Sequence, residues 1–65
     1  MVTLNDFFMI CEERSNIKKV ILHDGIKEIY NGPIIQPGDK LLDSIVYQFR
    51  FENDGTELII ETLLQ

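Results

Sequence analysis

The sequence has very few of the residues from which catalytic and metal centres are usually built. Cys11 is the only cysteine and His23 the only histidine among 65 residues. An internal disulfide is therefore excluded, and these two side chains cannot close a tetrahedral zinc site without carboxylates or a second chain. No P-loop, glycine-rich dinucleotide turn, HExxH or GxSxG pattern occurs. The sequence predicts a protein that is not an enzyme and holds no metal or cofactor.

Basic residues are also scarce. Six Lys and Arg against eleven Asp and Glu give a net charge of −5. This balance disfavours nonspecific binding to duplex DNA, which depends on neutralising phosphates. No apolar run approaches the roughly 20 residues that cross a bilayer, and no basic segment with a long apolar run opens the chain. We therefore expect no membrane association and a cytoplasmic location.

The chain length predicts a single domain spanning residues 1–65. A hydrophobic content of 45% is that of a folded protein. A chain this short buries only about 60% of its unfolded surface, so its stability is marginal without reinforcement. Since disulfides and a closed metal site are excluded, association is the remaining reinforcement. We expect a homo-oligomer, a dimer or larger.

The first residues predict a helix over residues 4–13. Thr3 can serve as N-cap, with Asp6 three residues later in an imperfect version of the capping box, where Glu or Gln is usual. Val2 and Phe7 occupy the two positions of a hydrophobic staple. An apolar stripe at helical spacing should be buried, and it consists of Leu4, Phe7, Phe8 and Cys11. Cys11 is therefore predicted to pack as a small hydrophobe rather than to act as a nucleophile.

The stretch "IKKVILHDGIKEIYNG" predicts a hairpin with a type I′ turn at Asp24-Gly25. This turn sets His23 opposite Ile26 and Val20 opposite Ile29. The predicted core side is formed by Val20, Leu22 and Ile29. Adjacent strand residues point to opposite faces, so His23 and Asp24 are not expected to converge on a substrate.

The stretch "SIVYQFRFENDGTELIIETLL" predicts a second hairpin, because apolar and polar residues alternate along it. A two-residue turn at Asp54-Gly55 pairs Phe51 with Leu58, Phe49 with Ile60, Tyr47 with Thr62 and Ile45 with Leu64. It also sets Glu52 opposite Glu57, where the two carboxylates repel unless a cation or a basic partner lies nearby. Between the hairpins, "PGDKLLD" predicts one helical turn that tucks Leu41 and Leu42 under the sheet.

Together these elements predict an α+β fold, with an N-terminal helix packed on a four-stranded antiparallel sheet made of two hairpins. The other face of this sheet then carries apolar residues mixed with Tyr and Arg, a composition typical of a contact surface. The predicted partner-binding or oligomer interface consists of Ile21, Ile26, Tyr30, Val46, Gln48, Arg50, Ile59 and Leu63.

Four segments, "MVTLNDFF", "ILHDGIKEIYNG", "PGDKLLDSIVYQF" and "NDGTELIIE", cover most of the chain. Their layout resembles that of small proteins encoded by phages and prophages of Gram-positive bacteria. The resemblance implies a host bacterial cytoplasm and, since several such proteins block host defences by binding, an inhibitor of an anti-phage defence protein. It implies no catalytic residues.

Two other functions remain open at this point. A sponge for a cyclic or ADP-ribose-type nucleotide signal would stack a base on tyrosine and bind phosphate with basic side chains. The residues available for this are Lys18, Lys19, Tyr30, Tyr47 and Arg50. An accessory or assembly subunit of a phage complex is the other alternative.

Overall fold

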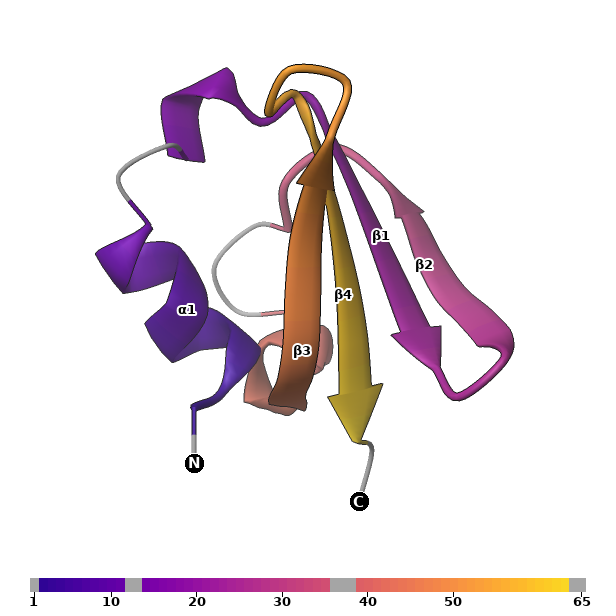
Figure 1. The fold of residues 1–65 in the computed structure, drawn as a ribbon. Helices are drawn as coiled ribbons and strands as arrows, with labels where there is room; N and C mark the ends of the chain where they lie inside the picture. The colour runs from indigo at the N-terminus through magenta and orange to yellow at the C-terminus, as the bar shows by residue number, and fades with distance from the viewer. Residues whose placement is uncertain (1, 12–13, 36–38, 64–65) are drawn as a thin grey trace.

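A computed structural model describes residues 2–11, 14–35 and 39–63 of the chain. One α-helix, two 3-10 turns and four strands follow one another in the described part (Figure 1). In chain order they are α1 (Leu4–Ile10), η1 (Arg14–Asn16), β1 (Lys19–Asp24), β2 (Lys27–Gly32), η2 (Lys40–Asp43), β3 (Ile45–Glu52) and β4 (Glu57–Leu63).

The sheet is mixed rather than purely antiparallel. Its strand order is β2-β1-β4-β3, with both hairpins antiparallel and β1 parallel to β4. The predicted α+β class is confirmed, whereas the predicted all-antiparallel sheet is wrong. The chain leaves β2 at one edge of the sheet and enters β3 at the other, so the last strand returns into the middle beside β1.

The two central strands are the ones that carry the most buried apolar residues. Val20 and Leu22 of β1, and Leu58 and Ile60 of β4, are fully buried. Parallel neighbours suit this position, because parallel pairing occurs mainly where a sheet is well covered. We call the face that carries these four residues the inner face of the sheet.

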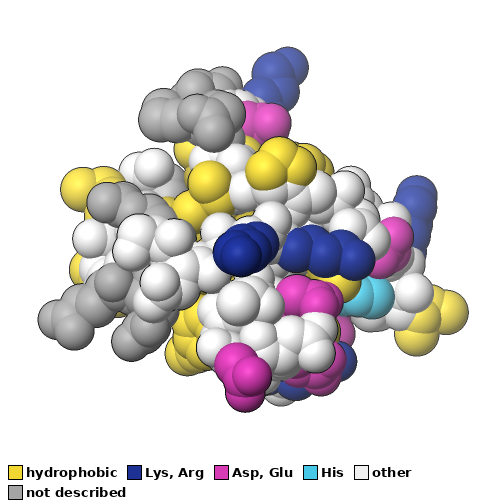
Figure 2. All heavy atoms as spheres, turned by 90° about the horizontal axis from the view of Figure 1, so that it is seen from above, with side chains coloured by type: hydrophobic (Ala, Val, Ile, Leu, Met, Phe, Trp, Pro, Cys, Tyr) yellow, Lys and Arg dark blue, Asp and Glu magenta, His cyan; other side chains and the backbone are white. Residues whose placement is uncertain are grey.

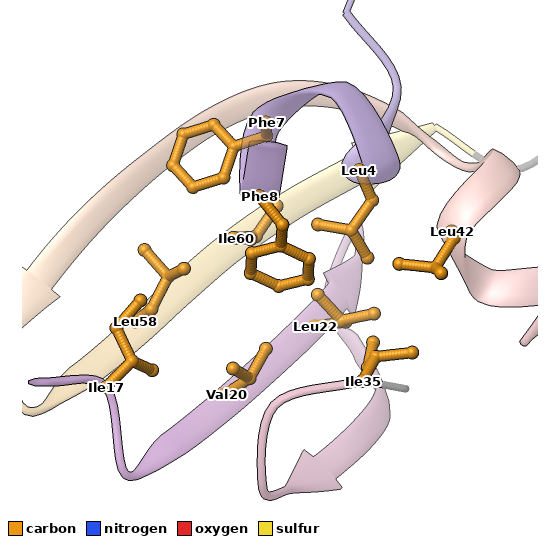
Figure 3. Close-up of a cluster of buried hydrophobic side chains, with 10 residues drawn as sticks. All are labelled: Leu4, Phe7, Phe8, Ile17, Val20, Leu22, Ile35, Leu42, Leu58 and Ile60. Carbon is orange, nitrogen blue, oxygen red and sulfur yellow. The ribbon is translucent and has the colours of Figure 1, made fainter. Parts of the chain in front are cut away.

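The helix and the β2–β3 crossover cover this inner face. Phe8 points from α1 toward Val20 and Leu22, and Ile35 and Leu42 of the crossover lie beside them (Figure 3). The complete buried cluster consists of Leu4, Phe7, Phe8, Ile17, Val20, Leu22, Ile35, Leu42, Leu58 and Ile60. The helical turn predicted in "PGDKLLD" is thus found as η2, with Leu42 buried and Leu41 packed against the cluster.

The helix begins where the sequence predicts and ends sooner. The Thr3 hydroxyl accepts a hydrogen bond from the Asp6 amide at 3.1 Å, and the Asp6 carboxylate accepts one from the Thr3 amide at 3.4 Å. The last helical residue is Ile10, and Cys11 has an extended backbone. A longer helix would set acidic residues at its negative end, which is unfavourable. Residues 12 and 13 of the predicted helix lie outside the described residues.

The first hairpin turns one residue later than predicted. Asp24 pairs with Lys27, so Gly25 and Ile26 form the turn, with Gly25 at φ 65°. A glycine in the first central position is typical of a type II′ turn, which requires a positive φ only there. The type I′ turn predicted at Asp24-Gly25 would force Asp24 to positive φ as well.

A β-bulge in the same hairpin changes which face β2 presents. His23 pairs with Glu28, but Leu22 pairs with Tyr30, so Ile29 is an extra residue. As a result, both Ile29 and Tyr30 pack against the core. The prediction for Ile29 is confirmed, while Tyr30 lies on the inner face instead of the outer face.

The second hairpin has the predicted register next to its turn. Phe51 pairs with Leu58 and Phe49 with Ile60, and the loop takes its shape from positive φ at Asn53, Asp54 and Gly55. The turn is wider than predicted, because the Gly55 amide bonds to the Glu52 carbonyl and residues 53–56 all lie outside the strands.

A second β-bulge, at Tyr47, shifts the far end of this hairpin. Val46 pairs with Thr62 and Gln48 with Glu61, which leaves Tyr47 without an opposite residue. The predicted pairs of Tyr47 with Thr62 and of Ile45 with Leu64 are therefore wrong, and Ile45 pairs with Leu63. The bulge shifts the side-chain alternation by one residue, so Val46, which precedes it, packs on the core although the sequence pattern places it outside.

Thr62 provides a test of the β1–β4 pairing. Its buried hydroxyl donates to the His23 carbonyl at 3.1 Å, across the parallel pair. Replacement Thr62→Val keeps the shape but removes the donor, so we expect the free energy of unfolding in urea to fall by about 1 kcal/mol. Thr56→Val is the control, since the Thr56 hydroxyl bonds to the Asn53 carbonyl in an exposed loop and water can replace it. An equal loss in both variants would contradict the assigned role of Thr62.

Candidate binding surface

An apolar groove lies between α1 and β3. Its volume is about 600 Å³, and its lining comes from the chain before the helix, the helix itself and the strand. The lining residues are Val2, Phe7, Ile10, Cys11, Val46, Tyr47, Gln48, Phe49 and Phe51. Apart from the Gln48 amide and the Tyr47 hydroxyl, the lining side chains are apolar or weakly polar, so the groove suits apolar groups of a ligand.

The start of α1 is fastened to the start of β3. The Val46 amide donates to the Val2 carbonyl at 2.8 Å, and the Leu4 amide donates to the Ser44 carbonyl at the same distance. Thr3 also forms an isolated antiparallel bridge with Ile45. These bonds hold the helix beside the edge strand, and Val2 and Phe7 of the predicted staple both face the groove.

Aromatic side chains form the floor of the groove. The ring centroids of Phe7 and Phe49 lie 4.8 Å apart at 60°, and those of Phe49 and Phe51 lie 6.1 Å apart at 81°. These are the tilted and edge-on arrangements that aromatic pairs prefer. The helix covers the floor only in part, because Phe49 is 51% exposed and Tyr47 is 69% exposed.

The outer face of the sheet has a different character from the one predicted. Register and alternation place Ile21 of β1 and Ile59 of β4 at its centre, and Ile59 is already buried within the fold. Around them lie mainly polar and charged residues, which are Lys19, His23, Glu28, Asn31, Gln48, Arg50, Glu52, Glu57 and Glu61. Figure 2 looks onto the end of the molecule that is at the top of Figure 1, where the β3–β4 loop lies, and there side chains of both charge signs lie close together in the middle of the view.

The structure divides the predicted interface residues between several places. Ile21, Ile59 and Arg50 lie on the outer face as expected, and Gln48, which is opposite Glu61 on that face, also borders the groove at the edge of the strand. Tyr30 and Val46 pack against the core from the inner face. Ile26 is fully exposed at the tip of the first hairpin, and the Leu63 side chain lies outside the described residues.

The residues considered for nucleotide binding are not brought together. Tyr30 packs on the core and donates its hydroxyl to the Pro33 carbonyl. Tyr47 lines the groove, whereas Lys19 and Arg50 belong to the outer face. Lys18 lies beside the second turn, where its amide bonds to the Thr56 carbonyl. The tyrosines and the strand cations therefore point to opposite sides of the sheet.

The acidic pair near the second turn has polar partners. Glu52 and Glu57 are directly opposite, as predicted. Arg50 Nε lies 3.1 Å from a Glu52 carboxylate oxygen, and the Asn53 side-chain amide donates to the Glu57 carboxylate. A basic group and an amide thus offset the repulsion between the two carboxylates.

The remaining candidate chemistry stays dispersed. His23 is half-buried on the outer face, in register with Glu28 and Glu61, and Asp24 beside it is exposed. Cys11 is a free thiol that packs partly against the core. Among residues 2–11, 14–35 and 39–63, no three His, Cys, Asp or Glu side chains gather closely enough to hold a metal. No helix in the described part of the chain is long and apolar enough to span a bilayer.

The fold is that of a small α+β protein with a mixed four-stranded sheet covered on one face. Comparison of the chain with protein-family models, curated proteins and solved structures finds no match.

Sequence reasoning missed the groove because it placed Phe49 and Phe51 only by their strand pairing with Ile60 and Leu58. The alternation in "YQFRF" shows only that these residues share a face. It does not show that the strand is an edge strand, or that the helix is too short to cover it. A seven-residue α1 reaches Phe49 through Phe7 and leaves the rest of the strand open.

The exposure of Phe49 yields a prediction about stability. Phe49→Ala should lower the free energy of unfolding by about 1 kcal/mol, because half of the ring is already in water. Phe8→Ala should cost about 3–5 kcal/mol or abolish the cooperative transition, since Phe8 lies at the centre of the core. Urea denaturation monitored by circular dichroism measures both losses. Equal losses would mean that Phe49 is a core residue and that the groove is closed in solution.

Proposed function

We propose that this protein is a non-enzymatic binding protein that acts by contact with another protein through the α1–β3 groove. The observation that supports this most directly is the row of exposed aromatic side chains, Tyr47, Phe49 and Phe51, along an edge strand beside an apolar groove. Aromatic anchors of this kind dominate the energetics of protein interfaces.

Exposing these apolar side chains to water is unfavourable, and the packing of the core does not require them to lie at the surface. The core closes without Tyr47, and Phe49 and Phe51 remain outside the buried cluster. Contiguous exposed apolar groups in a small soluble domain mark interaction sites. The groove therefore supports a binding role better than the outer face does, because the outer face is largely charged and its central Ile59 is already covered.

The target that we propose is a bacterial anti-phage defence protein, which the binding protein would inhibit by covering its surface. This part of the proposal is supported by the resemblance of the sequence to small phage and prophage proteins. Inhibition by contact suits a chain with so few candidate catalytic groups, because it requires no reaction centre.

The nucleotide sponge receives no support from the geometry, since Tyr47 and Arg50 lie on different sides of the sheet. Thermal-shift measurements with cyclic nucleotides and ADP-ribose derivatives test it directly. A large shift in melting temperature would favour the sponge over the proposed function. Co-purification with virion or assembly proteins from infected cells would instead favour the accessory subunit.

Tyr47→Asp is the variant that tests the proposed function. Bacteria that carry individual defence systems would express the protein, and the plating efficiency of a sensitive phage would be measured. Wild type should restore plating against one system and bind its purified component. Tyr47→Asp should lose both effects, with binding weakened by about 2 kcal/mol or more, because it places a charge in the apolar contact. The fold should persist, since Tyr47 is mostly exposed.

Ile26→Asp is the matched control, because Ile26 is also an exposed apolar residue but lies at the turn of the first hairpin. It should behave as wild type in plating and in binding. Loss of binding in Ile26→Asp with full binding in Tyr47→Asp would move the site away from the groove. Failure of wild type against every system tested would contradict the proposed target.

A further inference from the structure

The edge of β3 has one stretch of backbone that the fold leaves open. In the described part of the chain, β3 is the last strand of the sheet, and β4 is its only neighbour within it. Beyond that, the Val46 amide donates to the Val2 carbonyl, and Thr3 forms a bridge with Ile45, so residues 2 and 3 cover the edge of the first two residues of β3. The amides and carbonyls of residues 47–51 that point away from β4 therefore have no partner strand among the described residues, and they lie at an exposed edge next to aromatic side chains.

The geometry points to a second copy of this chain as the occupant of this edge. The two copies would pair β3 with β3 in antiparallel fashion, about a two-fold axis that passes beside Phe49. This inference goes beyond the proposed function, because it requires no host protein and involves the edge of the strand rather than the face of the groove.

The side chains of residues 47–51 are complementary to themselves in this register. Phe49 of one copy would lie opposite Phe49 of the other, and Tyr47, at the bulge, would lie next to Phe51. Gln48 would lie opposite Arg50, so that an amide oxygen faces a guanidinium group on the outer face. Each pair joins residues on the same side of the sheet, as antiparallel pairing requires.

Neighbouring registers are worse. An axis at Arg50 would set two arginines directly opposite, which is destabilising. An axis at Phe51 would set Phe49 opposite Asn53, which belongs to the loop and has a positive φ of 53°. An axis at Tyr47 would require the edge of Ile45 and Val46, which the chain's own residues 2 and 3 occupy. The register centred on Phe49 is the one that uses the open stretch and only that stretch.

The other edge strand is less suited to pairing. β2 is shorter, carries the bulge at Ile29 and begins with the charged residues Lys27 and Glu28. Bulges and edge charges are the features by which proteins prevent edge-to-edge association. β3 has its bulge at Tyr47, and the four residues from Gln48 to Phe51 after it run regularly.

Pairing at β3 also changes the groove. Antiparallel strands related by a two-fold axis keep their inner faces on the same side of the joined sheet. The two aromatic floors would then lie side by side across the two-fold axis. The dimer would present one long apolar groove in place of two short ones, and it would supply the reinforcement that so small a domain lacks.

Two substitutions of Gln48 test the register, because they act in opposite directions on the dimer and on the protomer. Within a protomer Gln48 is opposite Glu61, and across the axis it is opposite Arg50. Gln48→Lys should weaken dimerisation by about 2- to 30-fold, since two like-charge pairs form, while stabilising the protomer against urea. Gln48→Glu should tighten the dimer by a similar factor while destabilising the protomer.

Sedimentation equilibrium measures the dimer dissociation constant, and urea unfolding of dilute protein measures protomer stability. A wild-type protein that is monomeric at its highest soluble concentration would overturn the inference. A dimer dissociation constant that neither substitution changes, or that changes in parallel with protomer stability, would also overturn the inference. A monomeric wild type would leave the α1–β3 groove of the single chain, and with it the proposed function, to be judged by phage plating alone.

Cysteine cross-linking gives an independent measurement of the register, after replacement of the native thiol by Cys11→Ala. Phe49→Cys in this background should form an intermolecular disulfide under mild oxidation, because directly opposite residues lie about 4.5–5.5 Å apart between Cα atoms. Phe51→Cys should not, because its two copies would be offset by four residues, or about 13 Å. Cross-linking of Phe51→Cys at the rate of Phe49→Cys would overturn the register.

Discussion

The parallel pairing of β1 with β4 is the contact on which the rest of the structure depends. It joins the two hairpins, places four fully buried side chains in the middle of the sheet and gives α1 and the crossover one surface to cover. It also fixes which strands become edges. β3 lies outside β4 because β4 has returned beside β1, and the open groove follows from that order.

Local sequence signals predicted the elements well, because their causes are local. The Thr3–Asp6 capping box, the glycine-containing turns and the buried Leu42 depend on residues a few positions apart. The relative order of the hairpins could not be predicted in this way. Whether β4 lies beside β1 or at an edge depends on long-range burial, to which the spacing of Val20 or Ile60 is equally suited in either arrangement.

The bulges explain most of the errors in the predicted surfaces. Each inserts one residue, Ile29 or Tyr47, and reverses the side-chain alternation beyond it. Val46 and Tyr30 therefore moved from the outer face to the inner face. No turn residue or proline marks either bulge in the sequence, so a strict period of two continues through both. The groove was hidden for a related reason, since alternation shows which residues share a face but not whether that face is covered.

The attachment of α1 has a consequence for what the groove can accept. Backbone hydrogen bonds from Leu4 and to Val2 fasten the beginning of the helix, whereas Ile10 near its end is 73% exposed and meets the strand only across the groove. The main-chain bonds to Ser44 and Val46 thus fix the distance between the chain and the strand at one end of the groove. At Ile10 the helix borders the groove through an exposed side chain instead. A ligand would therefore meet fixed main chain at the Val2 end of the groove and an exposed aliphatic side chain at the Ile10 end.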